Sequence, residues 1–407
     1  GDGIESASRK PAHTFENPGT YTVTAVLGEC NSVVSNSVTI DGPPSSQAWY
    51  SDVLVGDGLG DSNVTLVQCG QPEGYVLEQL RNRLAKVASV DPMLLLALSG
   101  SSSPIGRVAV SSPEVDALLR RQQFPGEKLE EILAWDGAED IFAGLVDRYI
   151  LRAGISGVQP KVLVPELQDS APQRFTSKTS DLIIKSGRDE FPGLAINEFL
   201  CMSVARAAGI TVPEFYLSDN AKLFVMRRFD RDEQLNPVGF EDMAALMGLA
   251  AEQKYNKSYS AIAKAIRLFC SPEQVQGSLA QLFAMVSLSC IVGNGDAHLK
   301  NFGLLYSDPT RRDARLAPAF DIVNTTAYVP EDVLALDLVG NKSLFASRQG
   351  LLGFARVCDV ARPEEVIREQ LQALEQVLMR STELCEQAPH VVAAIKHSAS
   401  PYIRTFG

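Results

Sequence analysis

The feature that most constrains this chain is an apolar stretch over residues 279–292 that gives way to a polar, glycine-containing segment. The stretch has 14 residues and is interrupted only by Gln281, Ser287 and Ser289. A membrane span needs about 20 residues, so the pattern favours a helix buried in a protein core. Residues 271–274 read SPEQ, which is typical of a capping-box start with proline at the first helical position.

The segment that follows this helix, residues 293–301, has the sequence GNGDAHLKN. Asp296 and Asn301 lie five positions apart, which is the D-x-x-x-x-N spacing of kinase catalytic loops. In such loops the aspartate orients or deprotonates the acceptor hydroxyl, and the asparagine binds a metal ion. Protein kinases carry HRD at this aspartate and a lysine two positions later, whereas this chain has NGD and His298. A polar turn after a helix is the simpler alternative.

Three further charged residues occur in the order that a kinase requires. Asp321 follows an apolar run 20 residues beyond Asn301, where kinases place a metal-binding aspartate, although the usual Phe-Gly is missing. Lys185 ends an expected strand over 182–184 and could reach phosphate groups, and Glu198 lies 13 residues later, where it could pair with that lysine. A lone lysine at a strand end is usually just solvated, so the interpretation rests on the whole set.

Residues 154–161, with the sequence GISGVQPK, precede the first expected strand of this region. They match neither the Walker A motif nor the kinase GxGxxG loop. Two glycines flanking Ser156 could still present backbone N–H groups to a phosphate. In isolation the segment is equally compatible with an ordinary turn.

Taken together, these motifs resemble the HipA-like serine/threonine kinases, the toxins of HipBA-type toxin–antitoxin pairs. The resemblance covers about residues 140–328 and is carried by residues 154–161, 181–185, 191–195 with Glu198, 228–231, 293–301 and 317–321. It implies an α+β, bilobal protein-kinase-like fold of the HipA type, with a β-rich N-lobe and a helical C-lobe. A small β-rich N-terminal arm would precede the two lobes.

The resemblance also implies roles for individual residues, with ATP and Mg²⁺ as cofactors. The catalytic set would be Asp296, the base, with His298 and Lys300, and the metal ligands would be Asn301 and Asp321. ATP would be bound by Ser156, Gly157, Lys161, Lys185, Glu198, Arg227 and Phe229, of which the last two belong to the hinge beside adenine. In the family, a serine in the loop before the first strand is autophosphorylated, which silences the kinase. Relatives with Ser-x-Ser-Gly carry two such serines, whereas here Gly154 takes the first place and only Ser156 remains.

We expect four regions along the chain: a β-rich fragment over 1–43, a linker with a partial HipA N-terminal subdomain over 44–135, an N-lobe over 136–230 and a helical C-lobe over 231–407. Residues 20–26 and 35–40 alternate polar and apolar side chains, which predicts two strands. The first region resembles the second half of a PKD-type β-sandwich repeat, usually an extracellular module; an unrelated arm is the alternative. Half a sandwich cannot bury both of its sheets, so we expect residues 1–43 to be dispensable.

Charge and cysteine usage limit the partners and the compartment. Lys and Arg number 37 against 49 Asp and Glu, so the net charge is 37 − 49 = −12. Such a chain is poorly suited to bind DNA phosphates directly, and we expect DNA contact only through a basic partner. Seven scattered cysteines without metal-binding spacing favour a reducing, cytoplasmic location. The resemblance adds two expected partners, a protein substrate such as an aminoacyl-tRNA synthetase and a small helix-turn-helix antitoxin, and we expect no membrane partner.

Two functions of other classes remain open. A catalytically silent, ATP-binding subunit of an antitoxin–DNA repressor complex has no need of an intact catalytic set, yet Asp296, Asn301, Asp321 and Lys185 are all present. A surface adhesin would agree with the PKD-like fragment, but it would not agree with the cysteine usage or with an ATP-dependent core.

Overall fold

The computed structural model describes residues 19–27, 32–40, 74–84, 98, 105–107, 109–111, 115, 117, 119, 124–136, 140–152, 159–167, 181–187, 190–307, 311, 313–345 and 347–407. Its strands are β1 (Gly19–Leu27), β2 (Ser32–Ile40), β3 (Ala109–Ser111), β4 (Lys161–Pro165), β5 (Asp181–Ser186), β6 (Phe215–Leu217), β7 (Leu223–Arg227), β8 (Gly239–Asp242), β9 (Gly303–Tyr306) and β10 (Arg315–Leu316). Its α-helices are α2 (Gly74–Leu84), α5 (Leu129–Leu133), α6 (Ile141–Tyr149), α7 (Leu194–Ala207), α8 (Met243–Leu246), α9 (Tyr259–Phe269), α10 (Pro272–Val292), α11 (Ser347–Val357), α12 (Pro363–Arg380), α13 (Thr382–Gln387) and α14 (Pro389–Phe406). Short 3-10 helices are η2 (Ile150–Arg152), η3 (Ala251–Gln253) and η4 (Leu299–Asn301).

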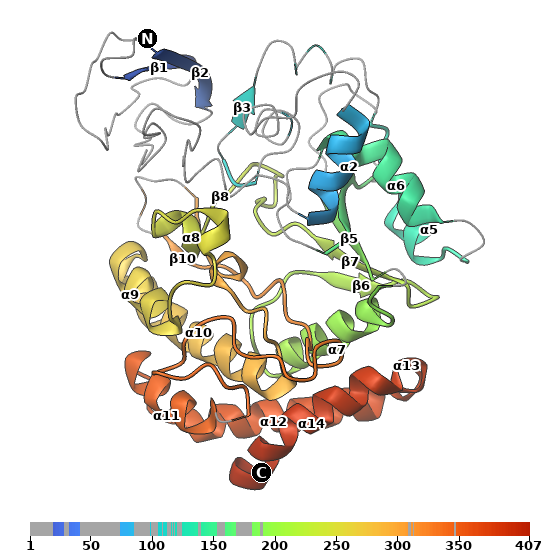
Figure 1. Cartoon of the computed structure of the whole chain (residues 1–407), viewed down its shortest axis with the longest axis vertical. Coiled ribbons are helices and arrows are strands. Elements are labelled where there is room, and N and C mark those ends of the chain that lie inside the picture. Colours follow the sequence, from blue (N-terminus) through green and yellow to red (C-terminus); the bar gives the residue numbers. More distant parts are fainter. Residues whose placement is uncertain are drawn as a thin grey trace.

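The described strands form three antiparallel sheets, and the helices fall into two groups. The strand orders are β4-β5-β7-β6, β10-β9-β8 and β1-β2-β3. Figure 1 shows α9 to α14 gathered in the lower half of the molecule, with α2, α5 and α6 beside the four-stranded sheet in the upper half. The strand predicted over 182–184 is therefore confirmed within β5, and the strand expected after residues 154–161 is β4.

The four-stranded sheet has two chemically different faces, because side chains alternate along each strand. The face toward α2, α5 and α6 is apolar and belongs to one hydrophobic cluster, with Val162, Val164, Leu182, Ile184 and Val225. The opposite face lines a pocket with Lys161, Ile183, Lys185 and Met226. The same alternation that buries one set of residues thus directs two lysines into the pocket.

Helix α10 is the centre of the helical part, with α9, α11, α12 and α14 packed around it. By length and composition it could cross a membrane, but 67% of its apolar window is buried inside the protein, as in a core helix. The predicted buried helix is confirmed. The capping box is not formed, however, because the Ser271 hydroxyl accepts a hydrogen bond from the Ala314 N–H at 3.0 Å rather than from its own helix.

Helices dominate residues 231–407, as predicted, with one addition. The small sheet β10-β9-β8 was not predicted, since its strands are too short to show an alternating pattern. The pairing of β8 with β9 joins the segment that follows β7 to the segment that follows α10. This pairing brings the predicted catalytic loop under the four-stranded sheet.

The N-terminal region contains the two predicted strands, β1 and β2, in antiparallel register from Gly19↔Ile40 to Leu27↔Ser32. The other edge of β2 pairs with β3 through Ser37↔Ser111, Val38↔Val110 and Thr39↔Ala109. The four buried cysteines of the described part, Cys201, Cys270, Cys290 and Cys358, are free thiols.

Candidate active site

The end of α10 fixes the predicted catalytic loop at the edge of the pocket. Gly293 ends the helix in the left-handed conformation, with φ at 78°. A Cβ atom there would lie 2.3 Å from Ser398 Oγ and 2.8 Å from Asn324 Nδ2, so only glycine fits both the conformation and the space. The chain then turns, and Asn294 Oδ1 accepts a hydrogen bond from the backbone N–H of Asp296 at 3.0 Å.

The pocket lies between the four-stranded sheet and this loop. It brings together eight of the predicted site residues, namely Lys161, Lys185, Phe229, Asp296, His298, Lys300, Asn301 and Asp321. Sequence reasoning had not assigned the other lining residues, which are Ile105, Gln159, Ile183, Met226, Arg228, Asp230, Phe240, Asp242, Lys254 and Phe320. Four lysines around one cavity favour an anionic ligand.

Asp296 lies at the exposed edge of the pocket, with its side chain 45% exposed. Its Oδ1 accepts a hydrogen bond from the Tyr255 hydroxyl at 2.8 Å. Partial burial and the nearby Asp321 carboxylate raise the pKa of Asp296 above its usual range, although the Tyr255 hydrogen bond opposes this. Asn301 Nδ2 donates to the backbone carbonyl of Asp296 at 2.8 Å, so the two residues of the spacing motif hold each other in place.

His298 is a neutral, buried imidazole within the pocket. Burial, together with the positive charge of Lys254, lowers the pKa of His298 to about 3. Its Nε2 lies 3.9 Å from Asp296 Oδ1, which is too far for a hydrogen bond. Its Nδ1 is buried and has no hydrogen-bond partner among the described residues, so it is placed to meet a ligand.

The strongest ionic contact of the pocket joins Lys185 to two carboxylates. Lys185 Nζ lies 2.5 Å from Glu198 Oε1 on α7 and 3.1 Å from Asp321 Oδ1. Burial alone would lower the pKa of Lys185, but Asp321 and Glu198 raise it, so the ammonium stays charged. Burial likewise favours the neutral acid of Asp321, but Lys185 and Lys161 hold its pKa below the usual range. Burial raises the pKa of Glu198 to about 7, against the pull of Lys185.

Lys161 lies directly opposite Lys185 in the register of β4 and β5. Both side chains are buried, and like charges in such cross-strand positions repel each other. The positive charge of Lys161 favours the ionised forms of Asp321, Glu198 and Asp296. It therefore acts to lower the pKa of all three carboxyl groups, against the burial that raises them. Two buried ammonium groups side by side favour the approach of an anion.

The other end of the pocket is apolar and aromatic. Phe229 stacks on Phe320 with ring centroids 5.1 Å apart and meets the edge of Phe240 at 5.6 Å. Phe320 immediately precedes Asp321, so the aromatic cluster is adjacent to the ion pairs of Lys185 with Glu198 and Asp321. A flat apolar group bound here would have its polar extension near the two lysines.

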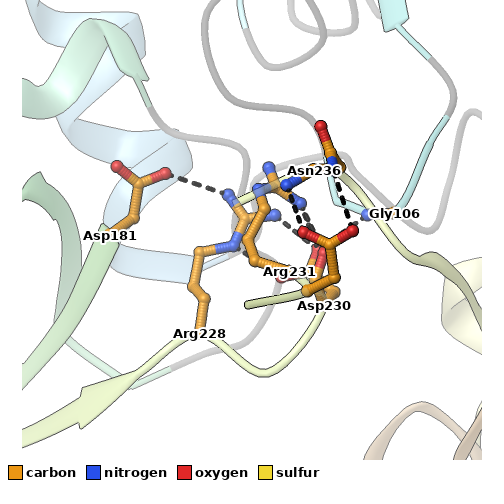
Figure 2. Close-up of polar contacts among 7 residues, drawn as sticks. Gly106, Asp181, Arg228, Asp230, Arg231 and Asn236 are labelled. Atoms are coloured by element: carbon orange, nitrogen blue, oxygen red, sulfur yellow. Dashed lines mark hydrogen bonds and ion pairs between the residues drawn. The ribbon is translucent and has the colours of Figure 1, made fainter. Parts of the chain in front are cut away.

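Beside the aromatic cluster lies a buried ionic network that sequence reasoning missed. Figure 2 shows Arg228 between Asp181 and Asp230, with Arg231 and Gly106 converging on Asp230. Arg228 Nη2 lies 2.5 Å from Asp230 Oδ2 and its Nη1 lies 3.3 Å from Asp181 Oδ2. The N–H of Gly106 donates to Asp230 Oδ2 at 2.7 Å. The network therefore fixes the segment 105–107, whose Ile105 lines the pocket, to the end of β7.

A second buried network connects α7 to the segment after Asp321. Asn197, next to Glu198, donates through Nδ2 to the carbonyl of Asn324 at 2.8 Å and accepts from its N–H at 2.8 Å. Asn324 Nδ2 in turn donates to the carbonyl of Val292 at 2.5 Å. These hydrogen bonds thereby connect α7, which carries Glu198, to the segment after Asp321 and to the end of α10. The sequence shows only two asparagines 127 positions apart, which gave no signal of this contact.

Two predicted ATP-binding residues of the described part, Arg227 and Glu198, do not line the pocket, although Glu198 is paired with the pocket residue Lys185. Arg227 points away from the pocket: its guanidinium binds Glu166 at 2.6 Å and also pairs with Glu214. Its backbone N–H donates to the carbonyl of Glu214, and that of Arg228 to the carbonyl of Asp181. The structure therefore places Arg227 on the sheet rather than in the pocket. Ser156 and Gly157 lie outside the described residues.

Comparison with protein families matches residues 153–380, more than half of the chain, to the HipA-like C-terminal domain. The chain belongs to this family. The match spans β4 to α12 and includes every predicted site residue. The resemblance predicted from the motifs is confirmed at this level.

Two curated relatives of this HipA-like chain carry kinase names. "Putative kinase Y4dM" of Sinorhizobium fredii is 32% identical over 180 residues, which are 40% of this chain and 42% of that protein. A "Putative kinase" of Haemophilus influenzae is 33% identical over 214 residues, which are 46% of this chain and 58% of that protein. The chain thus spans about half the length of the curated relatives it matches.

A solved structure shows the same mixed helix-and-sheet fold. A chain from the Shewanella oneidensis MR-1 toxin–antitoxin complex of HipA, HipB and operator DNA superimposes with a TM-score of 0.62 at 17% identity. The superposition covers 95% of this chain and 97% of that chain. At this identity the likeness concerns the fold alone, which is the HipA kinase-like fold that the sequence predicted. None of these comparisons supports the PKD-type resemblance of residues 1–43.

Proposed function

We propose that this HipA-like chain is an ATP-dependent serine/threonine protein kinase. The observation that carries the proposal is the Lys185–Glu198–Asp321 triad, which shares one pocket with Asp296 and Asn301. Phosphoryl transfer requires a lysine on the phosphates, an acid that holds the lysine, an aspartate for the metal and a base for the acceptor. The pocket offers one candidate for each task, in the order along the chain that kinases use.

ATP would bind with its base against the aromatic cluster and its phosphates near Lys161 and Lys185. The apolar rings of Phe229 and Phe320 suit a flat heterocycle. The adjacent lysines suit phosphates, and the neutral His298 can add one hydrogen bond. Two buried pocket atoms without partners among the described residues, His298 Nδ1 and Gln159 Oε1, are further candidates for ligand contacts.

Mg²⁺ would be held by Asp321 and Asn301 together with phosphate oxygens. The residues fit, because Mg²⁺ prefers oxygen ligands and usually takes only one or two of them from the protein. The Asn301 amide nitrogen is engaged by the Asp296 carbonyl, which leaves the carbonyl oxygen of that amide as the metal-binding atom. Among the described residues, no group of three or more His, Cys, Asp and Glu side chains is arranged to hold a metal ion by itself, so the nucleotide would complete the ligand set. When bound, the metal would neutralise the charge of the transferring phosphoryl group.

Asp296 would accept the proton of the acceptor hydroxyl. Its side chain is accessible from outside the pocket, and its raised pKa makes the carboxylate a stronger base than an ordinary aspartate. Lys300 lines the same side of the pocket and would stabilise negative charge on the transferring group.

In this proposal the four-stranded sheet with α7 forms an N-lobe over 136–230, and the helices from α9 onward belong to a C-lobe over 231–407. The separate hydrophobic cluster between the sheet, α2 and α6 supports the first unit. The larger cluster around α10 supports the second, although it also includes α7. ATP would bind between the two.

The biological role we propose is that of the toxin of a type II toxin–antitoxin system, acting in the cytoplasm on a translation-related protein such as an aminoacyl-tRNA synthetase. The related fold comes from a complex of HipA with HipB and operator DNA. A small helix-turn-helix antitoxin would be the partner here. With a net charge of −12, this chain would reach DNA indirectly, through that partner.

Autophosphorylation at Ser156 is a further part of the proposal. A phosphate there would add about −1.5 to −2 charges beside the ATP phosphates and would repel them. After incubation with Mg²⁺–ATP, mass spectrometry should find phosphate on Ser156 in the wild type but not in Asp296→Asn. An unmodified Ser156, or phosphorylation without loss of ATP affinity, would contradict self-silencing.

The decisive experiment is transfer of labelled γ-phosphate from ATP to proteins of a cell lysate, followed by identification of the labelled band. The wild type should label at least one protein, and Asp296→Asn should label none. Equal labelling by Asp296→Asn would refute the kinase assignment. ATP binding without any transfer by the wild type would instead favour the catalytically silent subunit.

A further inference from the structure

The side chain of Tyr255 holds the carboxylate that we assign as the general base. Its hydroxyl donates to Asp296 Oδ1 at 2.8 Å. A general base must lie about 2.6–3.2 Å from the oxygen whose proton it takes. The Tyr255 oxygen therefore has the distance to Asp296 that the hydroxyl of a phosphate acceptor would need.

Tyr255 is placed at the accessible edge of the pocket rather than in the core. The residue is 39% exposed and follows the short helix η3. Its ring meets the edge of the His298 ring at 5.2 Å, and its carbonyl accepts from Lys342 Nζ at 3.3 Å. The same ammonium donates to the carbonyl of Ala335 at 2.9 Å, so Tyr255 is tied to the chain that follows Asp321.

These contacts can be exchanged without opening the hydrophobic core. The hydrogen bond to Asp296 joins two partly exposed groups, and water or another hydroxyl can replace the phenol there. On the other side of the pocket, by contrast, the carboxylates of Glu198 and Asp321 are bound by a buried lysine. The side of the pocket with Asp296 and Tyr255, called the acceptor side, is the part of the site that a ligand can rearrange.

We propose that Tyr255 occupies the acceptor-hydroxyl site of Asp296 in the resting enzyme, and that a protein acceptor must displace it before transfer. This inference rests on the proposed kinase function. It makes Tyr255 a selectivity residue: an acceptor must compete with the phenol for Asp296 Oδ1. Water must compete as well, so Tyr255 limits wasteful ATP hydrolysis.

Hydrolysis provides a test that needs no knowledge of the natural substrate. In that reaction a water oxygen bonds to the γ-phosphorus, the bond from this phosphorus to the β–γ bridging oxygen breaks, and Asp296 takes a proton from the water. The products are ADP and inorganic phosphate. If the phenol competes with water, removing its hydroxyl should speed this reaction.

The variant to make is Tyr255→Phe, which keeps the ring contact with His298 and removes only the hydroxyl. Without acceptor protein, ATP hydrolysis should rise about three- to tenfold, the range expected for loss of one hydrogen bond to a charged, partly exposed group. With dephosphorylated casein as the acceptor, KM for casein should fall by a similar factor. KM for ATP and kcat for casein should stay the same.

Tyr306→Phe is the matched control. The Tyr306 hydroxyl also donates to a carboxylate, Glu241 Oε1, at 2.9 Å, but that carboxylate, unlike Asp296, does not line the pocket. This variant should hydrolyse ATP and phosphorylate casein like the wild type. Thermal midpoints of all three proteins would identify any effect of misfolding.

Other results would overturn the inference. A fall in kcat for Tyr255→Phe would mean that the hydroxyl positions Asp296 rather than blocks it, and unchanged kinetics would mean that it does neither. Phosphate on Tyr255 in the wild type would make it an acceptor. If the wild type neither binds nor hydrolyses ATP, the proposed kinase function fails first, and that outcome is separate from a failure of the Tyr255 inference alone.

Discussion

The two sides of the pocket hold their carboxylates in different ways. On the side that we assign to the ATP phosphates, called the phosphate side, the side chains of Glu198, Lys185 and Asp321 are 1%, 5% and 17% exposed. Their charges bind one another. On the acceptor side, Asp296 is 45% exposed and is held by a neutral hydroxyl and by the fixed backbone of its loop.

This difference follows from the cost of burying charge. A buried carboxylate without a partner is strongly destabilising, so the phosphate side must be paired before any ligand arrives. An exposed carboxylate keeps contact with water and can exchange one partner for another. The side of the pocket with Lys185 is therefore part of the fold, whereas the side with Asp296 can exchange its partners. Substitutions on the two sides should therefore differ in their effects on the free energy of unfolding.

The largest loss of stability is expected for Lys185→Met. This change leaves Glu198 and Asp321 without their buried counter-charge, and removing one partner of a buried ion pair costs about 3–5 kcal/mol. Denaturant unfolding should show the loss, and calorimetric titration with Mg²⁺–ATP should show no binding.

The double variant Lys185→Met, Glu198→Gln provides the control. It removes one of the two uncompensated carboxylates, so it should recover part of the lost stability without restoring ATP binding. If it were no more stable than Lys185→Met, the loss would come from packing of the lysine rather than from its charge.

The buried network around Arg228 should give the next largest effect. Asp230→Asn weakens the contacts with Arg228, Arg231 and the Gly106 N–H, at a cost of about 2–3 kcal/mol, since Arg228 keeps Asp181. Because Gly106 is the neighbour of Ile105 in the pocket, KM for ATP should rise as well.

This substitution also has a pH signature. Burial favours the neutral acid, but Arg228 and Arg231 hold the pKa of Asp230 below its usual range. The stability it contributes is therefore present above the unfolded pKa of about 3.9 and is lost as pH falls through the lower, folded value. The difference in unfolding free energy between wild type and Asp230→Asn should be constant from pH 5 to 8 and should shrink below about pH 4. A difference that is independent of pH down to pH 2 would contradict this account.

The sequence was most informative where a motif of chemically active residues lies next to a recognisable helix or strand. The spacing of Asp296 and Asn301 after a buried helix was the basis for predicting the loop, and the apolar run that ends at Lys185 was the basis for predicting the strand β5. The alternation of side chains along β7 could have corrected the prediction for Arg227. This residue shares a face with Val225 and not with the pocket residue Met226. The next residue, Arg228, lines the pocket.

The rest could not be predicted because it depends on contacts between distant segments. The reciprocal hydrogen bonds of Asn197 and Asn324, and the bond between Gly106 and Asp230, join residues more than 100 positions apart. Tyr255 lies 41 positions before Asp296, in a segment with no motif. Such pairs are set by the packing of whole elements, and a single sequence carries no local pattern for them.

A small effect on stability is expected on the acceptor side. Asp296→Asn keeps the shape of an exposed side chain, and an amide oxygen can still accept the Tyr255 hydrogen bond. Its unfolding free energy should stay within about 0.5 kcal/mol of the wild type. Phosphate transfer should nevertheless fall on the order of 10²–10⁴-fold, because the proton acceptor is gone. A stability loss like that of Lys185→Met would mean that the two sides are not distinct in the way proposed.

The smallest effect is expected on removal of residues 1–43. The sequence predicted that this fragment is dispensable, but β2 pairs with β3, so the truncation breaks one short strand pairing. That pairing covers three residues of β3, and the pocket contacts of Ile105 and Gly106 begin before it in the chain and do not include it. A chain that starts at Pro44 should therefore keep its rate of phosphate transfer, and its thermal midpoint should fall by only a few degrees. A change in KM for ATP would show that β3 transmits the state of the N-terminal strands to the segment 105–107, and it would make these strands part of the site.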